Sequence, residues 1–347
     1  MSAAQAAAGS AGVVRVLGTG GTIAGVSHTG RDRDYQAASL SVEALVAAVP
    51  ALAGVPLQCH QVCQVDSKDM GWPQWRLLLA ACLEALNDPV VAGVVVTHGT
   101  DTLEETALLL QVLLPPVKPV VLTAAMRPAT SAEADGPANL ALAVRCAQAW
   151  AGQARGVAVA VQGRLWPALA VRKAHSWAID AFDGGGVCPL PAEPPASPAL
   201  ALWPPSWGRL EQAGAQPLLH AETLPWVPCI VSHADAQATL VQALAAHVPA
   251  PQGWLLACTG HGTAHAHLLA ALQQQPQPVW RASRVARGGI APPGHEAMPA
   301  VGWLTPAQGR LLLSVALAVS GPDVQALEGW RQRLLAEPGL ADLLMPD

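Results

Sequence analysis

The chain has 347 residues, of which 52% are hydrophobic and 12% are charged, and its formal net charge is −5. The apolar content excludes an intrinsically disordered chain, and because no run approaches the roughly 20 apolar residues of a membrane-spanning helix, we expect no contact with a membrane. The acidic balance and the absence of a Lys/Arg run argue against binding to nucleic acid.

The cysteines and the first residues bear on the cellular compartment. The seven cysteines are odd in number and scattered along the chain, which favours reduced thiols over a disulfide framework. The first twelve residues contain neither a basic stretch nor a leucine-rich one, so they are not typical of a signal peptide. We therefore predict a cytoplasmic globular protein.

In the first half of the chain, short β-branched runs alternate with longer helical stretches. Near-continuous apolar runs are typical of parallel strands that are covered on both faces, and they predict strands at residues 13–18, 90–99, 119–126 and 156–163. The intervening periodicity, with a helix-start signal at Asp135-Gly136-Pro137, predicts helices at 73–87, 102–114 and 136–151.

A stretch rich in proline and tryptophan, residues 188–228, interrupts this alternation and predicts a connector with short extended pieces. The alternation then resumes, with strands expected at 229–234, 253–260 and 278–283, and helices at 235–247, 263–275, 306–320 and 323–336.

This order of elements predicts a two-domain α/β protein. We expect a larger N-terminal, mostly parallel α/β domain at residues 13–190 and a smaller C-terminal α/β domain at residues 228–347. A Pro/Trp-rich linker at residues 191–227 is expected to join them.

Ligands of open parallel sheets bind beyond the carboxyl ends of the strands, and the first polar segment at such a position is GTGGTIAG, residues 18–25. Residue 23 is Ile, so the third glycine of a dinucleotide fingerprint is missing, and the Gly-Lys-Ser/Thr of a P-loop is also absent. The segment is therefore either a simple glycine turn or a bare backbone that leaves the hydroxyl of Thr22 open to a ligand.

The second polar segment is THGTDT, residues 97–102. Asp101 followed by Glu104 resembles a capping box, so Asp101 either caps the next helix or joins Thr100 in holding a polar substrate at the helix start. Three further stretches, taken alone, indicate only polar turns, a helix start or surface positions: residues 65–70, 123–137 and 171–175.

Together, TGGTIAG (19–25), THGTDTLEETA (97–107) and AMRPATSAEADGPANL (125–140) resemble, in order and spacing, the bacterial asparaginase/glutaminase amidohydrolase family. The resemblance runs from about residue 13 to residue 320 and implies a two-domain asparaginase-like fold. It implies hydrolysis of L-asparagine to L-aspartate and ammonia through a threonine acyl-enzyme, with a minor activity on glutamine and with no metal or cofactor. It also implies a homo-oligomer, a dimer or tetramer, in which neighbouring subunits share the active sites.

The resemblance also assigns roles to individual residues. Thr22 is expected to be the nucleophile and Tyr35 its activating partner, because a threonine hydroxyl is a weak nucleophile unless a base assists it. A second catalytic cluster is expected from Thr100, Asp101 and Lys173. The residues expected to contact the small amide substrate are Gly21, Ser67, Lys68, Thr100, Asp101, Ala125 (through its backbone), Thr263 and Glu296.

The chain departs from the family pattern at several of these positions. Lys68 stands where secreted members commonly carry a glutamine that touches the substrate ammonium, and its charge repels that group unless it pairs with an acid such as Asp66 or Asp69. Residues 260–263, GHGT, replace a Gly-Asn-Gly-Asn stretch that a neighbouring subunit donates, and Glu296 is the nearest candidate for the neighbour's acidic residue. We therefore expect weaker substrate affinity than in secreted members.

The sequence leaves two alternative functions open. A glutaminase or amidase that supplies ammonia is one alternative, and a catalytically degenerate amide-binding relative is another. A metal site at His261, His265 and His267 is not favoured, because no cysteine or carboxylate partner is evident near them.

Overall fold

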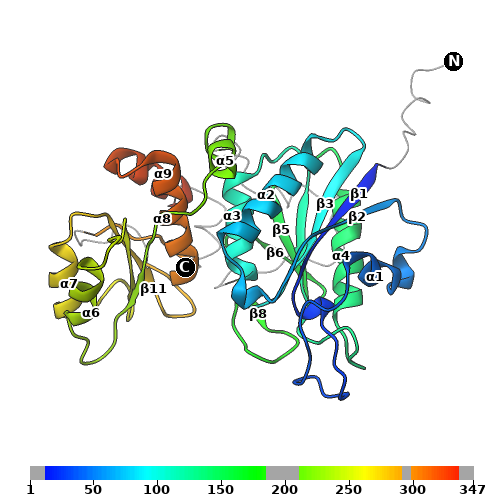
Figure 1. The fold of residues 1–347 in the computed structure, drawn as a ribbon, viewed down its shortest axis with the longest axis horizontal. Helices are drawn as coiled ribbons and strands as arrows, with labels where there is room; N and C mark the ends of the chain where they lie inside the picture. The colour runs from blue at the N-terminus through cyan, green and yellow to red at the C-terminus, as the bar shows by residue number, and fades with distance from the viewer. Residues whose placement is uncertain (1–11, 185–210, 291–297, 336–347) are drawn as a thin grey trace.

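Of the three sheets in the described residues, two organise the fold, a six-stranded sheet in the N-terminal part (residues 12–184) and a three-stranded sheet in the C-terminal part (residues 211–290 and 298–335) (Figure 1). The computed structural model describes residues 12–184, 211–290 and 298–335. Within these three ranges, no helix is both long enough and apolar enough to cross a bilayer.

The larger sheet has six strands in the order β2-β1-β3-β4-β5-β6, and the first five are parallel. Their bounds are β1 Val13–Gly20, β2 Leu57–Val65, β3 Val91–Thr97, β4 Val120–Thr123, β5 Val157–Val161 and β6 Arg164–Pro167. The four strands predicted in this part are confirmed. Three of them, β3, β4 and β5, end two or three residues before the predicted bounds.

Helices cover both faces of this sheet, which explains why its central strands are apolar at nearly every position. Alternate strand residues such as Val94 and Val96 pack with α2 (Trp72–Asn87) and α3 (Leu103–Leu113). The residues between them, such as Val95, pack with α1 (Val42–Ala47) and α4 (Gly136–Ala149). The three helices predicted here are confirmed as α2, α3 and α4.

The smaller sheet has three parallel strands in the order β11-β10-β9. Helices α6 and α7 pack on one face, while α8 lies on the other face and also contacts α3. One hydrophobic cluster therefore continues from the larger sheet through α8 to the smaller one. The bounds are β9 Cys229–Val231, β10 Trp254–Cys258, β11 Val279–Ser283, α6 Thr239–Ala245, α7 Ala266–Gln273, α8 Pro306–Ser320 and α9 Val324–Leu335.

The predicted linker is only partly within the described residues, because 191–210 lie outside them. Its described remainder contains a helix, α5 (Glu211–Leu219), which packs on α2, α3 and α8, so the expectation of extended pieces alone is wrong there. The domain bounds stay a prediction. Further elements were not predicted: α1, β2, β6, the short pair β7 (Arg172–Lys173) and β8 (Phe182–Asp183), and the 3-10 turns η2 (Thr22–Ala24), η3 (Pro50–Leu52) and η4 (Ser67–Asp69).

Candidate active site

The site lies where the carboxyl ends of the neighbouring strands β1 and β3 meet. Gly21 follows β1 with φ of +79°, a backbone conformation that favours glycine, and a Cβ at this position would overlap the backbone of Gly99. Glycine at both positions therefore lets the loops that carry Thr22 and Thr100 approach each other at one edge of the sheet.

The first threonine has a tyrosine as its partner. Thr22 begins η2, is 9% exposed, and places its Oγ1 2.8 Å from the hydroxyl oxygen of Tyr35. The Tyr35 ring packs against Gly25. Tyr35 belongs to residues 27–36, here called the lid segment, whose base is closed by an antiparallel bridge between Val26 and Gln36.

The second threonine has a lysine as its partner. Lys173, on the short strand β7, donates from Nζ to Thr100 Oγ1 at 2.9 Å and to Asp101 Oδ1 at 2.6 Å. The lysine side chain is 17% exposed, against 52% for that of Asp101. These three residues, expected to form one cluster, are therefore in contact.

A half-buried glutamate lies directly behind this lysine. Glu104 accepts the backbone N–H of Lys173 at 2.8 Å through Oε2, and it accepts the hydroxyl of Thr305, at the start of α8, at 2.8 Å through Oε1. Burial raises the pKa of Glu104. The capping-box alternative is wrong: Thr102 is the N-cap of α3 and makes no side-chain cap, while Glu104 contacts Lys173 and α8.

A second buried network, which sequence reasoning missed, supports the loop before Thr100. His98 is fully buried, with Nδ1 2.7 Å from the carbonyl of Gly99 and Nε2 2.9 Å from Thr106 Oγ1. Because a carbonyl only accepts, the ring carries its proton on Nδ1, and Thr106 donates to Nε2 while accepting from the indole of Trp75 at 2.8 Å. Burial lowers the pKa of His98 to about 4, so the ring is neutral at pH 7.

The loop after β2 adds Ser67 to the site. Its hydroxyl accepts the backbone N–H of Asp101 at 3.2 Å, and its carbonyl accepts the hydroxyl of Thr102 at 2.8 Å. The serine is 3% exposed. These bonds place Ser67 beside the Thr100 cluster, and its contact with substrate stays a prediction.

The neighbouring Lys68 is exposed and pairs with acids of its own loop. Its ammonium binds the carboxylate of Asp69 and lies 3.8 Å from that of Asp66. The hydrogen bond to Asp69 raises the pKa of Lys68, so the side chain keeps its charge at neutral pH. The pairing weakens the repulsion expected between Lys68 and a substrate ammonium.

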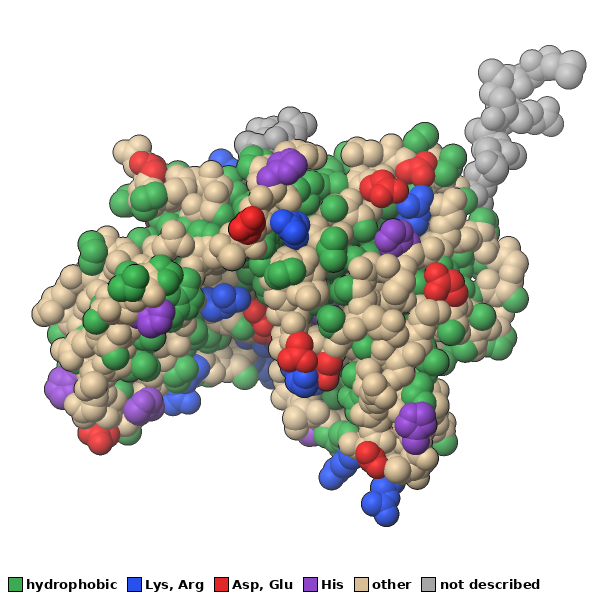
Figure 2. All heavy atoms as spheres, viewed as in Figure 1, with side chains coloured by type: hydrophobic (Ala, Val, Ile, Leu, Met, Phe, Trp, Pro, Cys, Tyr) green, Lys and Arg blue, Asp and Glu red, His purple; other side chains and the backbone are tan. Residues whose placement is uncertain are grey.

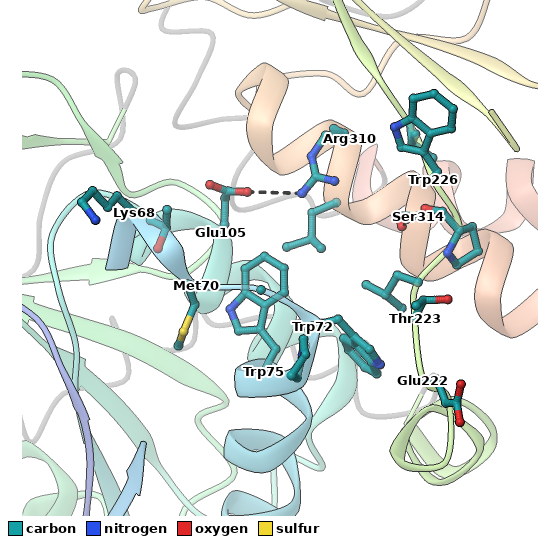
Figure 3. A pocket seen from close by; sticks show the side chains of 17 residues that line it. Lys68, Met70, Trp72, Trp75, Glu105, Glu222, Thr223, Trp226, Arg310 and Ser314 are labelled. Carbon is teal, nitrogen blue, oxygen red and sulfur yellow. Dashed lines mark hydrogen bonds and ion pairs between the residues drawn. The ribbon is translucent and has the colours of Figure 1, made fainter. Parts of the chain in front are cut away.

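Lys68 also lines a cavity of about 510 Å³ between α2, residues 222–227 and α8 (Figure 3). Indole rings of Trp72 and Trp75 line it, as do Glu105 and Arg310, which form an ion pair 3.5 Å apart. Among the described residues its lining includes Thr102 but neither Thr22 nor Thr100, so this cavity lies beside the threonine clusters rather than between them.

The remaining expected substrate contacts have different positions. Ala125 follows β4 and is buried with Ile23, next to Gly136. Thr263 lies in the C-terminal part, is exposed, and accepts the hydroxyl of Thr259 at its carbonyl at 2.9 Å. Glu296 lies outside the described residues. Within one chain, the candidate residues of the N-terminal part therefore come together, whereas Thr263 makes its hydrogen bond with Thr259 in the C-terminal part.

The chain matches a family model described as Asparaginase, N-terminal, over residues 13–192. A probable periplasmic L-asparaginase of Haemophilus influenzae is 40% identical over 49% of this chain and 48% of that protein. A glutaminase-asparaginase of Acinetobacter glutaminasificans is 30% identical over 88% of the chain and 94% of that protein. The chain thus spans about half of the length of several curated relatives and nearly all of another.

A solved structure is similar over most of the chain. The crystal structure of a probable cytoplasmic L-asparaginase from Campylobacter jejuni aligns with a TM-score of 0.77 and 27% sequence identity, and the alignment covers 92% of this chain and 99% of that one. This similarity confirms the two-domain α/β fold that the sequence predicted.

Proposed function

The chain belongs to the asparaginase family, and from that premise we propose that it hydrolyses the side-chain amide of L-asparagine to L-aspartate and ammonia, with a minor activity on L-glutamine. One observation carries the proposal. Two threonine hydroxyls lie at adjacent strand ends, one 2.8 Å from a phenol and the other 2.9 Å from an ammonium group. Paired hydroxyl and proton-transfer groups of this kind are what acyl transfer requires.

The proposed reaction has two halves. The Oγ1 of Thr22 attacks the amide carbon while its proton passes to the hydroxyl of Tyr35, which releases its own proton toward the leaving nitrogen, and the resulting tetrahedral oxyanion needs fixed hydrogen-bond donors. The C–N bond then breaks, and the leaving nitrogen takes a proton and departs as ammonia. Water attacks the acyl-threonine ester, which releases L-aspartate and restores the Thr22 hydroxyl.

The Thr100 cluster acts on the same substrate. Lys173 relays protons through the hydroxyl of Thr100, and Asp101 keeps the lysine oriented through their 2.6 Å contact. Ser67, whose hydroxyl meets the backbone N–H of Asp101, binds the α-carboxylate, while the Asp101 carboxylate receives the α-ammonium. Ala125 contributes a backbone contact.

We also propose that the protein works as a cytoplasmic homo-oligomer. Thr263 is exposed and makes its described hydrogen bonds with Thr259 in the C-terminal part, which suits a residue that serves the site of a neighbouring copy together with Glu296. Sedimentation of the active enzyme is the direct check. A fully active, stable monomer contradicts a shared site.

The central experiment is release of ammonia from L-asparagine and L-glutamine by the wild type and by Thr22→Ala. We expect asparagine to be the better substrate and the variant to lose about 10³-fold or more in kcat, because removing a nucleophile leaves only binding and oxyanion stabilisation. Adding hydroxylamine to the wild type traps the acyl group as a hydroxamate, which reports the covalent intermediate directly.

Thr239→Ala changes an exposed threonine of the C-terminal part and is the matched control. Unchanged activity in Thr22→Ala contradicts the nucleophile assignment. A wild type that binds asparagine but releases no ammonia instead identifies a degenerate amide-binding relative, and a preference for glutamine identifies the ammonia-supplying alternative.

A further inference from the structure

The lid segment that carries Tyr35 has little backbone support of its own. The bridge between Val26 and Gln36 closes its base, and beyond it the segment projects from the N-terminal part as the dark blue loop in Figure 1. Most of its residues are exposed. The position of the Tyr35 hydroxyl therefore depends on the side chains that hold this segment against the rest of the molecule.

Trp177 provides the surface on which the lid segment rests. It lies in the loop between β7 and β8, and the guanidinium of Arg33, in the lid segment, lies over its ring with 4.6 Å from Cζ to the ring centroid. The guanidinium of Arg127 lies over the same ring at 4.2 Å. Arginine over an indole face is a favourable cation–π contact, and a stronger one where water is excluded.

Arg127 connects this ring to the lid segment by a second route. Its guanidinium is almost buried, donates to the carbonyl of Trp177 at 2.8 Å, and has Asp32 of the lid segment 3.4 Å from its Nε. The backbone of Arg127 is held by Asp135, which accepts its N–H at 3.0 Å. If the lid segment opens, the buried guanidinium loses its carboxylate partner, which favours the closed arrangement.

We propose that Trp177 is a positioning residue of this enzyme, which holds the lid segment closed through Arg33 and Arg127 and thereby keeps the hydroxyl of Tyr35 on Thr22. Trp177 touches neither threonine in any contact described above. Trp177 stands four positions after Lys173. The loop that follows Lys173 of the Thr100 cluster therefore also holds the segment that carries Tyr35, the partner of Thr22.

The proposal rests on the proposed function only in its kinetic consequences, so the first test does not need activity. Trypsin has two exposed targets in the lid segment, Arg31 and Arg33. In Trp177→Ala we expect cleavage after these residues, identified by mass spectrometry, to be about tenfold faster, because proteolysis follows the population of the open segment. Asp32→Asn, which removes only the charge, is expected to have a smaller effect in the same direction.

Trp226→Ala is the matched control, because Trp226 is 36% exposed, lies in the C-terminal part and makes an edge-on ring contact with His247 instead. Its cleavage after Arg31 and Arg33 is expected to match the wild type. Cleavage of Trp177→Ala at the wild-type rate overturns the proposal. So does faster cleavage at sites throughout the chain, since that result identifies a residue that merely supports the fold.

The kinetic test separates positioning from general stability. Trp177→Ala is expected to lower kcat on asparagine by about tenfold with little change in KM, because Tyr35 acts in the transition state. In a Tyr35→Phe background the same substitution is expected to have almost no further effect, since the group that it positions is gone. Effects that multiply in the double variant overturn the proposal, whereas an inactive wild type refutes the proposed function and leaves the cleavage test decisive.

Discussion

The two threonine clusters are built in different ways. Thr100 faces a lysine whose backbone is held by a half-buried glutamate, and the loop before it rests on the fully buried His98. Thr22 faces a tyrosine from the half-exposed lid segment. The first cluster is therefore preorganised by the packed core, whereas the second is complete only while a surface segment stays closed. The difference suggests that one cluster is permanent and the other is assembled around substrate.

The largest effect is expected at Lys173. Lys173→Met keeps the length of the side chain but removes the ammonium that contacts Thr100 and Asp101, so kcat on asparagine should fall by about 10³-fold or more. Lys173→Arg keeps the charge and is the control for packing. A Met variant that retains a tenth of the wild-type kcat contradicts the idea that the preorganised cluster is essential.

His98, the buried histidine that supports the loop before Thr100, predicts that the stability of the protein depends on pH. His98 has a pKa of about 4 in the native state against 6.5 for the ordinary side chain, so between these values the unfolded chain binds a proton that the native state does not. As the pH falls through this window, the free energy of unfolding should fall by about 3 kcal/mol because of this group.

Urea unfolding of the wild type and of His98→Gln from pH 7 to pH 4 checks this prediction. The variant should be less stable at pH 7 by about 1–3 kcal/mol, since the hydroxyl of Thr106 and the carbonyl of Gly99 lose their partner, but its stability should change less with pH. His28→Gln, at an exposed position, serves as the control. Parallel pH curves for wild type and His98→Gln contradict the assignment.

Tyr35→Phe tests the assembled cluster. The variant keeps the ring that packs against Gly25 and loses the hydroxyl 2.8 Å from Thr22, so kcat should fall by about 10²-fold while KM changes little. Rapid-mixing measurements should show slower release of the first ammonia. An unchanged kcat would place the proton acceptor of Thr22 elsewhere and weaken the contrast between the clusters.

The smallest effect is expected at Lys68, which follows Ser67 of the Thr100 site. Lys68→Gln removes a cation that the acids of its own loop already balance, so KM for asparagine should fall by only about two- to fivefold, with kcat unchanged. The wild-type KM should be above that of secreted relatives. A submicromolar wild-type KM contradicts the weaker affinity expected from the sequence.

Much of the larger sheet was predictable because its strands are buried on both faces. β1, β3, β4 and β5 are nearly continuous runs of Val, Leu and Ala, a pattern that few other structures produce. β2, LQCHQVCQV, was missed because it lies at the edge of the sheet and mixes polar with apolar residues. The two-residue strands β7 and β8 carry no periodic signal at all.

The sequence by itself determined the fold class and indicated which residues are candidates for the reaction, since apolar runs and matching motifs are properties of short segments. Only the tertiary structure decided how those residues support one another. Lys173 reaches Thr100 across 73 positions, and Trp177 reaches Arg127 across 50. The stability of such contacts depends on burial, geometry and the loss of water around each charge, and these arise only when the chain has folded.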